Sequence, residues 1–237
     1  MAPEDIIRKT IQATTQFNLS LEVENRMNPR MHIKSRAPGL RSSRQHELVA
    51  SDTFFPSVTS DRGNTCSQLF IGQKSKRWEV FPLKSEFQNG IALQDYIRKC
   101  RAPLTIKKDN AQSELGKKWL DTCCSQCINT ETTKPHHPWQ NPCEREIGSL
   151  SNMVCRCMQE FKVPLRKHDW CQKCCVDVHN ILAHRNLGWR TPMKVSSGHT
   201  PDISVFCFHI WEPIWYYVAT LKSPQECLKK GRLLGIA

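Results

Sequence analysis

The stretch from Asp109 to Arg145, DNAQSELGKKWLDTCCSQCINTETTKPHHPWQNPCER, decides the fold of this chain. A short apolar run at Leu104 and Ile106 precedes it and predicts a strand that ends on the acid Asp109. The stretch closes just after a second acid, Glu144, and apolar residues recur between the two acids at helical spacing, at Leu115, Trp119, Cys123 and Cys127. The two carboxylates can therefore meet only if strand, helix, strand and helix fold back on one another.

A third acid, Asp52, lies within the strand-like run from Leu48 to Phe55. Three carboxylates held together suit a divalent metal, because Mg²⁺ prefers hard oxygen ligands and two such ions can clamp an in-line displacement at phosphorus. The three acids thus predict a metal site, with Asp52, Asp109 and Glu144 as catalytic and metal-binding residues.

The helix that follows Asn141 has the clearest start and period in the sequence. Asn141 is a good N-cap, Pro142 suits the first helical position, and one apolar stripe follows at Cys143, Ile147, Leu150, Val154, Met158 and Phe161. Further strands are expected at 68–72, 77–83 and 129–133, and further helices after Ser85, after Ser113 and over 169–184.

These acids and two later motifs resemble the integrase core of copia-type retrotransposons. The likeness rests on Asp52, Asp109, the approach QNPCER to Glu144, and the stretches GWRTPM (188–193) and GHTPD (198–202). It runs from about His46 to the C-terminus and implies a ribonuclease H-like fold, a mixed five-stranded sheet flanked by helices. It also implies the α/β class, with a catalytic core at 46–200 and a truncated extension with short strands at 201–237. Residues 1–45 are rich in basic residues and poor in large apolar ones, and they are expected to form a poorly ordered basic linker.

The resemblance further implies a polynucleotidyl transferase that works with two Mg²⁺ or Mn²⁺ ions. Such an enzyme trims the 3′ ends of the element DNA with water and joins the 3′ hydroxyls to phosphates of target DNA. Asp52 and Asp109 would hold or bridge the metals and Glu144 would complete the second site. DNA and further copies of the chain are the expected partners, and the nucleus is the expected compartment.

The charge of the chain independently favours a polyanionic partner. The formal net charge is +12 and the isoelectric point is near 9.2, and such an excess of Lys and Arg attracts nucleic acid through counterion release. The candidate nucleic-acid contacts are Arg30, Lys34, Arg36, Arg41 and Arg44 in the linker and Lys107, Lys108, Asn110, Gln140, Asn141 and Arg145 beside the acids. The alternative for each basic residue is an ordinary solvated surface charge.

The cysteines and aromatic residues suggest other functions that are less favoured. Thirteen cysteines, an odd number in a chain large enough to form a core, indicate reduced intracellular thiols. Two groups, C-x₂-C at 124–127 and H-x₂-C-x₂-C at 168–174, have zinc-like spacing, but both lie in segments of helical period and zinc is disfavoured. Trp189, Trp211, Trp215 and the pair at 216–217 are interpreted as core residues, and the most apolar stretch, 203–218, is interrupted by charged residues and proline and does not resemble a membrane span.

Three alternatives remain open from the sequence. Glu144 stands three positions after an Asn N-cap, so it could simply hydrogen-bond back to the cap. The chain could be an inactive remnant that binds DNA through its basic surface. It could also, with less support, be a regulatory module that binds zinc.

Overall fold

The computed structural model describes residues 3–15, 44–108, 116–132, 142–206, 208–217 and 228–235. Its centre is a five-stranded sheet in the order β3-β2-β1-β4-β5, with bounds β1 Gln45–Phe54, β2 Cys66–Gly72, β3 Trp78–Leu83, β4 Pro103–Lys108 and β5 Asn129–Thr132. β1 is antiparallel to β2 and β2 to β3, whereas β4 is parallel to both β1 and β5. This is the expected mixed sheet of the ribonuclease H-like fold, so the predicted fold class is confirmed.

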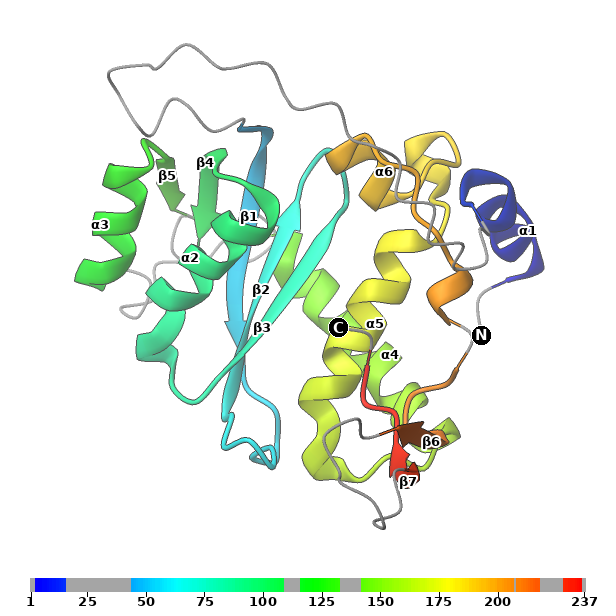
Figure 1. Ribbon diagram of the computed structural model, residues 1–237. Helices are drawn as coiled ribbons and strands as arrows, with labels where there is room; N and C mark the ends of the chain where they lie inside the picture. The colour runs from blue at the N-terminus through cyan, green and yellow to red at the C-terminus, as the bar shows by residue number, and fades with distance from the viewer. Residues whose placement is uncertain are drawn as a thin grey trace.

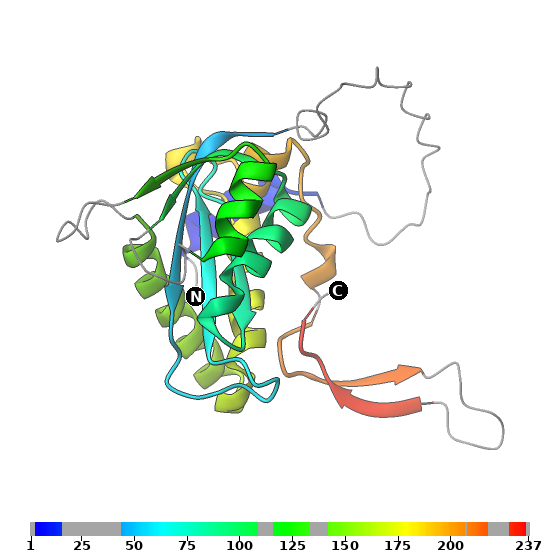
Figure 2. The ribbon, with the colours of Figure 1, turned by 90° about the vertical axis from the view of Figure 1, so that its left-hand side faces the viewer.

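Helices cover both faces of the sheet (Figures 1 and 2). One face packs on α2 (Asn89–Cys100) and α3 (Lys117–Ser125), and the other packs on α4 (Pro142–Glu160) and α5 (His168–Ile181). Because both faces are covered, β2 is buried at every position.

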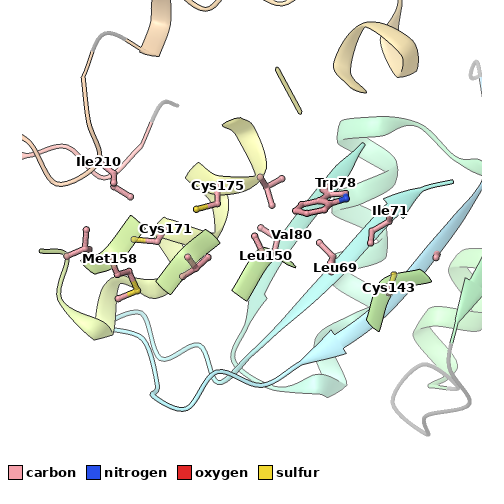
Figure 3. Packing of buried hydrophobic residues seen from close by; sticks show 14 residues of the cluster. Leu69, Ile71, Trp78, Val80, Cys143, Leu150, Met158, Cys171, Cys175 and Ile210 are labelled. Atoms are coloured by element: carbon pink, nitrogen blue, oxygen red, sulfur yellow. The ribbon is translucent and has the colours of Figure 1, made fainter. Parts of the chain in front are cut away.

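Strand alternation divides the core into two clusters. Val49 and Phe70 belong to the α2-side cluster, whereas their neighbours Ala50 and Leu69 belong to the α4-side cluster, and all four are fully buried. Figure 3 shows Leu69, Ile71 and Val80 of the sheet facing the helices of the α4-side cluster. Any residue of β1 can therefore be assigned to one of the two faces by its position.

The predicted apolar stripe of α4 is confirmed. Cys143, Leu150, Val154 and Met158 are buried, and Ile147 and Phe161 pack against the same cluster. Ser85 also acts as predicted, because its hydroxyl accepts a hydrogen bond from the Phe87 amide at the short helix η2 (Glu86–Gln88) that leads into α2. The remaining short helices are η5 Leu165–Lys167, η6 Arg185–Leu187, α6 Pro192–Ser197 and η7 Ser204–Phe206.

The expectation of a poorly ordered linker at 1–45 is wrong for residues 4–13, which form the helix α1 (Glu4–Ala13). The Thr10 hydroxyl accepts a 2.9 Å hydrogen bond from the Ala183 amide, and Thr15 exchanges backbone hydrogen bonds with Pro201 and Ile203. Figure 1 shows α1 beside the segment that carries α6. α1 is ordered because it docks on residues near 183 and 201, a long-range contact that local composition does not reveal.

β6 (Pro213–Tyr217) and β7 (Leu228–Arg232) pair as a separate antiparallel ribbon, which projects from the body in Figure 2. Short strands are found here as expected, but the interpretation of Trp215 and Tyr217 as core residues is wrong. Their side chains are 66% and 67% exposed, because a two-stranded ribbon has no layer to cover it. Among the helices of the described segments, none is long and apolar enough to cross a membrane.

Candidate metal centre and nucleic-acid interface

Asp52 lies on the face of the sheet that α4 covers. Ala50 and Phe54, two residues before and after it on β1, both belong to or pack against the α4-side cluster, so alternation places Asp52 on that face. Its neighbour on β2 is Leu69, and its Oδ1 accepts a 2.8 Å hydrogen bond from the Thr53 amide. The aspartate is partly exposed, whereas Ser51 before it is fully buried.

A buried polar network fixes β1 from the opposite face of the sheet. Gln68 Nε2 donates to Ser51 Oγ at 3.1 Å, and Gln68 Oε1 accepts from Thr53 Oγ1 at 2.5 Å. Asn89 Nδ2, on α2, donates to the same Thr53 hydroxyl at 3.1 Å. Ser51 and Thr53 flank Asp52, so this network holds the aspartate's backbone on both sides. In the sequence, the only sign of this network is the polar residues at alternate positions of the strand, Ser51 and Thr53.

Glu144 lies in the first turn of α4, a helix that packs on β1 and β2 on the Asp52 side of the sheet. Cys143, fully buried, joins the α4-side cluster together with Leu69, the β2 neighbour of Asp52. Glu144 itself is exposed. The N-terminal end of a helix also carries a partial positive charge, which favours a carboxylate there. The structure therefore brings the two described acids of the predicted triad to the same face of the sheet, from β1 and from α4.

Strand register separates Lys107 from Lys108, two neighbours that the sequence analysis treated alike. Lys107 pairs with Ala50, so it lies on the Asp52 face and is partly exposed. Lys108 pairs with Ser51 on the other face, is only 1% exposed, and its Nζ lies 5.9 Å from the Trp119 ring centroid. Lys107 is thus the better placed of the two to meet a phosphate.

Two predicted arginine contacts have different surroundings. Arg145 is 80% exposed beside Glu144, and its guanidinium forms a 3.0 Å ion pair with Glu146. Arg44 instead donates to the backbone carbonyls of Gln126 and Cys127, at the turn between α3 and β5. Arg44 therefore has a structural role in joining β1 to that turn, and its contact with nucleic acid stays a prediction.

The other predicted residues lie outside the described segments. These are Asp109 and Asn110, Gln140 and Asn141, and the linker residues Arg30, Lys34, Arg36 and Arg41. Asp109 follows Lys108 in the sequence, and Lys108 pairs with the residue before Asp52. The convergence of all three carboxylates remains a prediction.

The donor chemistry of Asp52 and Glu144 fits a hard divalent cation. Both offer carboxylate oxygens, from a strand and a helix that pack together, and oxygen is the donor that Mg²⁺ and Mn²⁺ prefer. Within the described segments, no group of three or more His, Cys, Asp or Glu side chains is arranged to hold a metal ion. Asp109 lies outside these segments.

The two cysteine and histidine groups with zinc-like spacing have different surroundings. His168 Nδ1 lies 3.1 Å from the Leu165 carbonyl oxygen, and Cys171 is fully buried in the α4-side cluster. Cys124 and Cys127 are exposed at the end of α3. The two groups thus lie on different helices, on opposite sides of the sheet.

Comparison of the structure with solved structures identifies similar folds among retroviral integrases. The catalytic core domain of human T-lymphotropic virus 2 (HTLV-2) integrase, solved with magnesium, is 19% identical and has a TM-score of 0.53, covering 66% of this chain and 99% of that one. An integrase chain of a simian T-cell lymphotropic virus intasome, solved with the regulatory subunit B56 gamma of PP2A, is 17% identical with a TM-score of 0.57, covering 85% and 72%. The catalytic core of BIV integrase is 16% identical with a TM-score of 0.50, covering 63% and 93%.

At these identities the similarity establishes the fold, that of a retroviral integrase catalytic core. No protein-family model matches the sequence, and the comparison with curated proteins gave no match. The activity must therefore be argued from the residues of this chain.

Proposed function

We propose that this chain is an integrase-type polynucleotidyl transferase of the copia kind, which processes the 3′ ends of element DNA and joins them to target DNA. The observation that carries the proposal is that Asp52 faces the side of the sheet covered by α4, the helix whose first turn bears Glu144. The integrase-core fold and the basic charge of the chain support it. On this proposal Asp109 supplies the third carboxylate.

Phosphoryl transfer asks the protein mainly to position the reactants and to stabilise charge. Asp52, Asp109 and Glu144 would hold two Mg²⁺ or Mn²⁺ ions, and the magnesium bound to the HTLV-2 core supports this choice of metal. Bound metal would lower the pKa of the attacking water or hydroxyl and stabilise the leaving oxygen. The network of Ser51, Thr53 and Gln68 would keep Asp52 in place without touching DNA.

Lys107 and Arg145 would flank the reacting phosphates, since both lie beside the acids on the α4 side of the sheet. We further propose that the chain works as a homo-oligomer in the nucleus. The dimeric and trimeric forms of the HTLV-2 core and the simian virus intasome support oligomerisation and DNA as the partner.

A strand-transfer assay on the full chain with element-end DNA tests the proposal. Mg²⁺ or Mn²⁺ should support joining. Glu144→Gln should lower the joining rate at least about 100-fold, because loss of a metal ligand should cost at least as much as loss of a residue that only hydrogen-bonds to a ligand. Glu160→Gln is the matched control, since it makes the same change at the exposed far end of α4. A Glu144→Gln protein that joins DNA as fast as the control would show that Glu144 is only a cap.

The inactive DNA-binding remnant is the second candidate, favoured by the charge of +12 alone. It predicts DNA binding without joining under any metal condition. Tight stoichiometric zinc in the purified protein would instead favour the zinc-binding module.

A further inference from the structure

Three cysteine thiols meet between α4 and α5, away from the carboxylates. Cys157 lies in the last turn of α4, and Cys171 and Cys175 are one turn apart on α5, where residues at this spacing share a helix face. Cys157 packs against the buried cluster that contains Cys171 and Cys175, and Cys157 and Cys175 line the same cavity. Figure 3 shows the sulfur atoms of Cys171 and Cys175 on the same side of α5.

Cys157 is the member of this group that solvent can reach. Cys171 and Cys175 are 0% and 6% exposed, whereas Cys157 is only partly buried. It lines a largely apolar cavity of about 490 Å³, which Cys175 also lines and which Phe161 and His209 help to close. A small uncharged reagent can therefore reach Cys157 from the cavity, whereas Cys171 has no exposed surface and Cys175 has little.

The hydrogen bonds favour a thiolate within the group. The Cys171 and Cys175 thiols, as donors, hold the pKa of the Cys157 thiol well below its ordinary value, although burial acts against this. The pKa values of Cys171 and Cys175 are raised in turn, first by their bonds to Cys157 and then by burial. The C-terminal end of α4 carries a partial negative charge, which disfavours a thiolate there. This effect is smaller than the stabilisation of the thiolate by two direct hydrogen-bond donors. The thiolate is the nucleophilic form of cysteine, so one reactive sulfur faces the cavity.

We propose that Cys157 is a peroxide-reactive thiol that is oxidised to a sulfenic acid and then forms a disulfide with Cys171 or Cys175, linking α4 to α5. In the first step the Cys157 thiolate attacks hydrogen peroxide, the O–O bond breaks, and hydroxide leaves and takes up a proton as water. In the second step the thiol of the α5 partner attacks the sulfenic sulfur, its proton leaves with the hydroxyl as a second water, and an S–S bond forms. Sulfur is oxidised, and the named peroxide is the oxidant.

The site is separate from the proposed catalytic centre. Cys157 lies thirteen residues after Glu144 on the same helix, which at 1.5 Å per residue is roughly 20 Å along its axis. Oxidation can therefore be measured without any assay of DNA joining, and the result does not depend on the proposed activity.

The test uses the reduced full chain, treated with hydrogen peroxide and then with dimedone, which traps sulfenic acids. Mass spectrometry should find the Cys157 peptide labelled at least about tenfold more than the Cys155 peptide. Cys155 is the internal reference, because it is an exposed thiol two residues away on the same helix. Without dimedone, non-reducing digestion should give a disulfide between the Cys157 peptide and the Cys171 or Cys175 peptide.

Variants separate the two steps. The double variant Cys171→Ser, Cys175→Ser should lose the disulfide and keep a sulfenic acid at Cys157, and Cys157→Ser should lose both products. Cys155→Ser should behave as the parent protein, and circular dichroism checks that every variant is folded. Equal labelling of Cys155 and Cys157, or an oxidised protein in which Cys157 forms no bond to α5, would overturn the proposal.

Discussion

At the scale of single residues, Glu79 carries the best defined buried charge in the described segments. This β3 residue is 3% exposed, and its carboxylate forms ion pairs with Arg77 at 2.8 Å and with Lys99 at 2.7 Å. Burial alone would lower the pKa of the Lys99 ammonium, but the Glu79 carboxylate raises it above its ordinary value. Through Lys99, a residue of α2, the carboxylate ties this helix to the edge of the sheet.

Glu79→Gln should lower the free energy of unfolding by about 3–5 kcal/mol, because it leaves the mostly buried Arg77 guanidinium without its counterion. Urea denaturation measures the change. Asp95→Asn is the control, because it breaks the exposed pair with Arg98 and should cost no more than about 1 kcal/mol. Similar losses in the two variants would contradict the structural role assigned to Glu79.

His179 should make the stability of the protein sensitive to acid. Its ring stacks on Trp78 at 3.6 Å, and its Nε2 lies 3.1 Å from the Lys76 carbonyl, so Nε2 is the nitrogen that carries the proton in the neutral ring. Burial lowers the pKa of His179 from 6.5 to about 4, with a smaller contribution from the nearby His184. Between these pH values the unfolded chain binds more protons than the folded protein.

The contribution of His179 to stability is therefore complete above pH 6.5 and is lost as the pH falls toward 4. The expected loss is up to about 3 kcal/mol, since each pKa unit corresponds to roughly 1.4 kcal/mol. Denaturation at a series of pH values, compared with His179→Gln, isolates this effect from the other titrating groups. A parent protein and variant with the same slope over this range would show that His179 does not titrate with unfolding.

At the scale of elements, the Thr10 hydroxyl is a main contact that docks α1 on the rest of the protein. Thr10 Oγ1 accepts from the buried Ala183 amide at 2.9 Å and donates to the Ile6 carbonyl at 2.8 Å. Thr10→Val keeps the shape but leaves the amide unsatisfied, which costs about 1–3 kcal/mol. Hydrogen exchange should then show residues 4–13 losing protection while β2 keeps its own, and Thr10→Ser should restore it. Unchanged protection in Thr10→Val would mean that other contacts hold α1.

The elements also show what the sequence can and cannot predict. α4 was predictable because its periodic stripe states locally which side is buried, and β2 because the apolar residues 69–71 between polar neighbours indicate a short buried strand. α1 was not, because the partner of Thr10 lies more than 170 residues away in the chain. Trp215 was interpreted as a core residue because large aromatic side chains are usually buried. The sequence does not show that no second layer covers the ribbon of β6 and β7.

For the candidate site the sequence supplied the residues, and their role as metal ligands stays a prediction. Asp52 and Glu144 could be chosen from spacing and resemblance, and the structure places both on the α4 side of the sheet. The difference between Lys107 and Lys108 could not be predicted, because it follows from the pairing of β4 with β1. A shift of one residue in that register would exchange their faces.

At the scale of the whole molecule, one sheet carries two cores and the candidate site belongs to both. Asp52 faces the α4-side cluster, whereas the hydrogen bonds around its neighbours Ser51 and Thr53 lie on the side of α2. Loosening either helical layer should therefore disturb the position of the aspartate. Asn89, on a helix behind the sheet, should therefore contribute to the position of Asp52 through its hydrogen bond to Thr53.

The net charge of +12 belongs to the molecule as a whole, and it predicts how DNA binding responds to salt. The logarithm of the affinity for a short duplex should fall linearly with the logarithm of salt concentration, with a slope of about −0.9 for each phosphate neutralised. Fluorescence anisotropy of a labelled duplex at several KCl concentrations measures the slope.

Arg145→Gln should reduce the magnitude of this slope by about 1 if the arginine meets a phosphate beside Glu144. Arg98→Gln, an equal change on exposed α2 behind the sheet, should leave the slope unchanged. Equal slopes in both variants would exclude the α4 side as the DNA-binding face, and an affinity independent of salt would exclude electrostatic binding altogether.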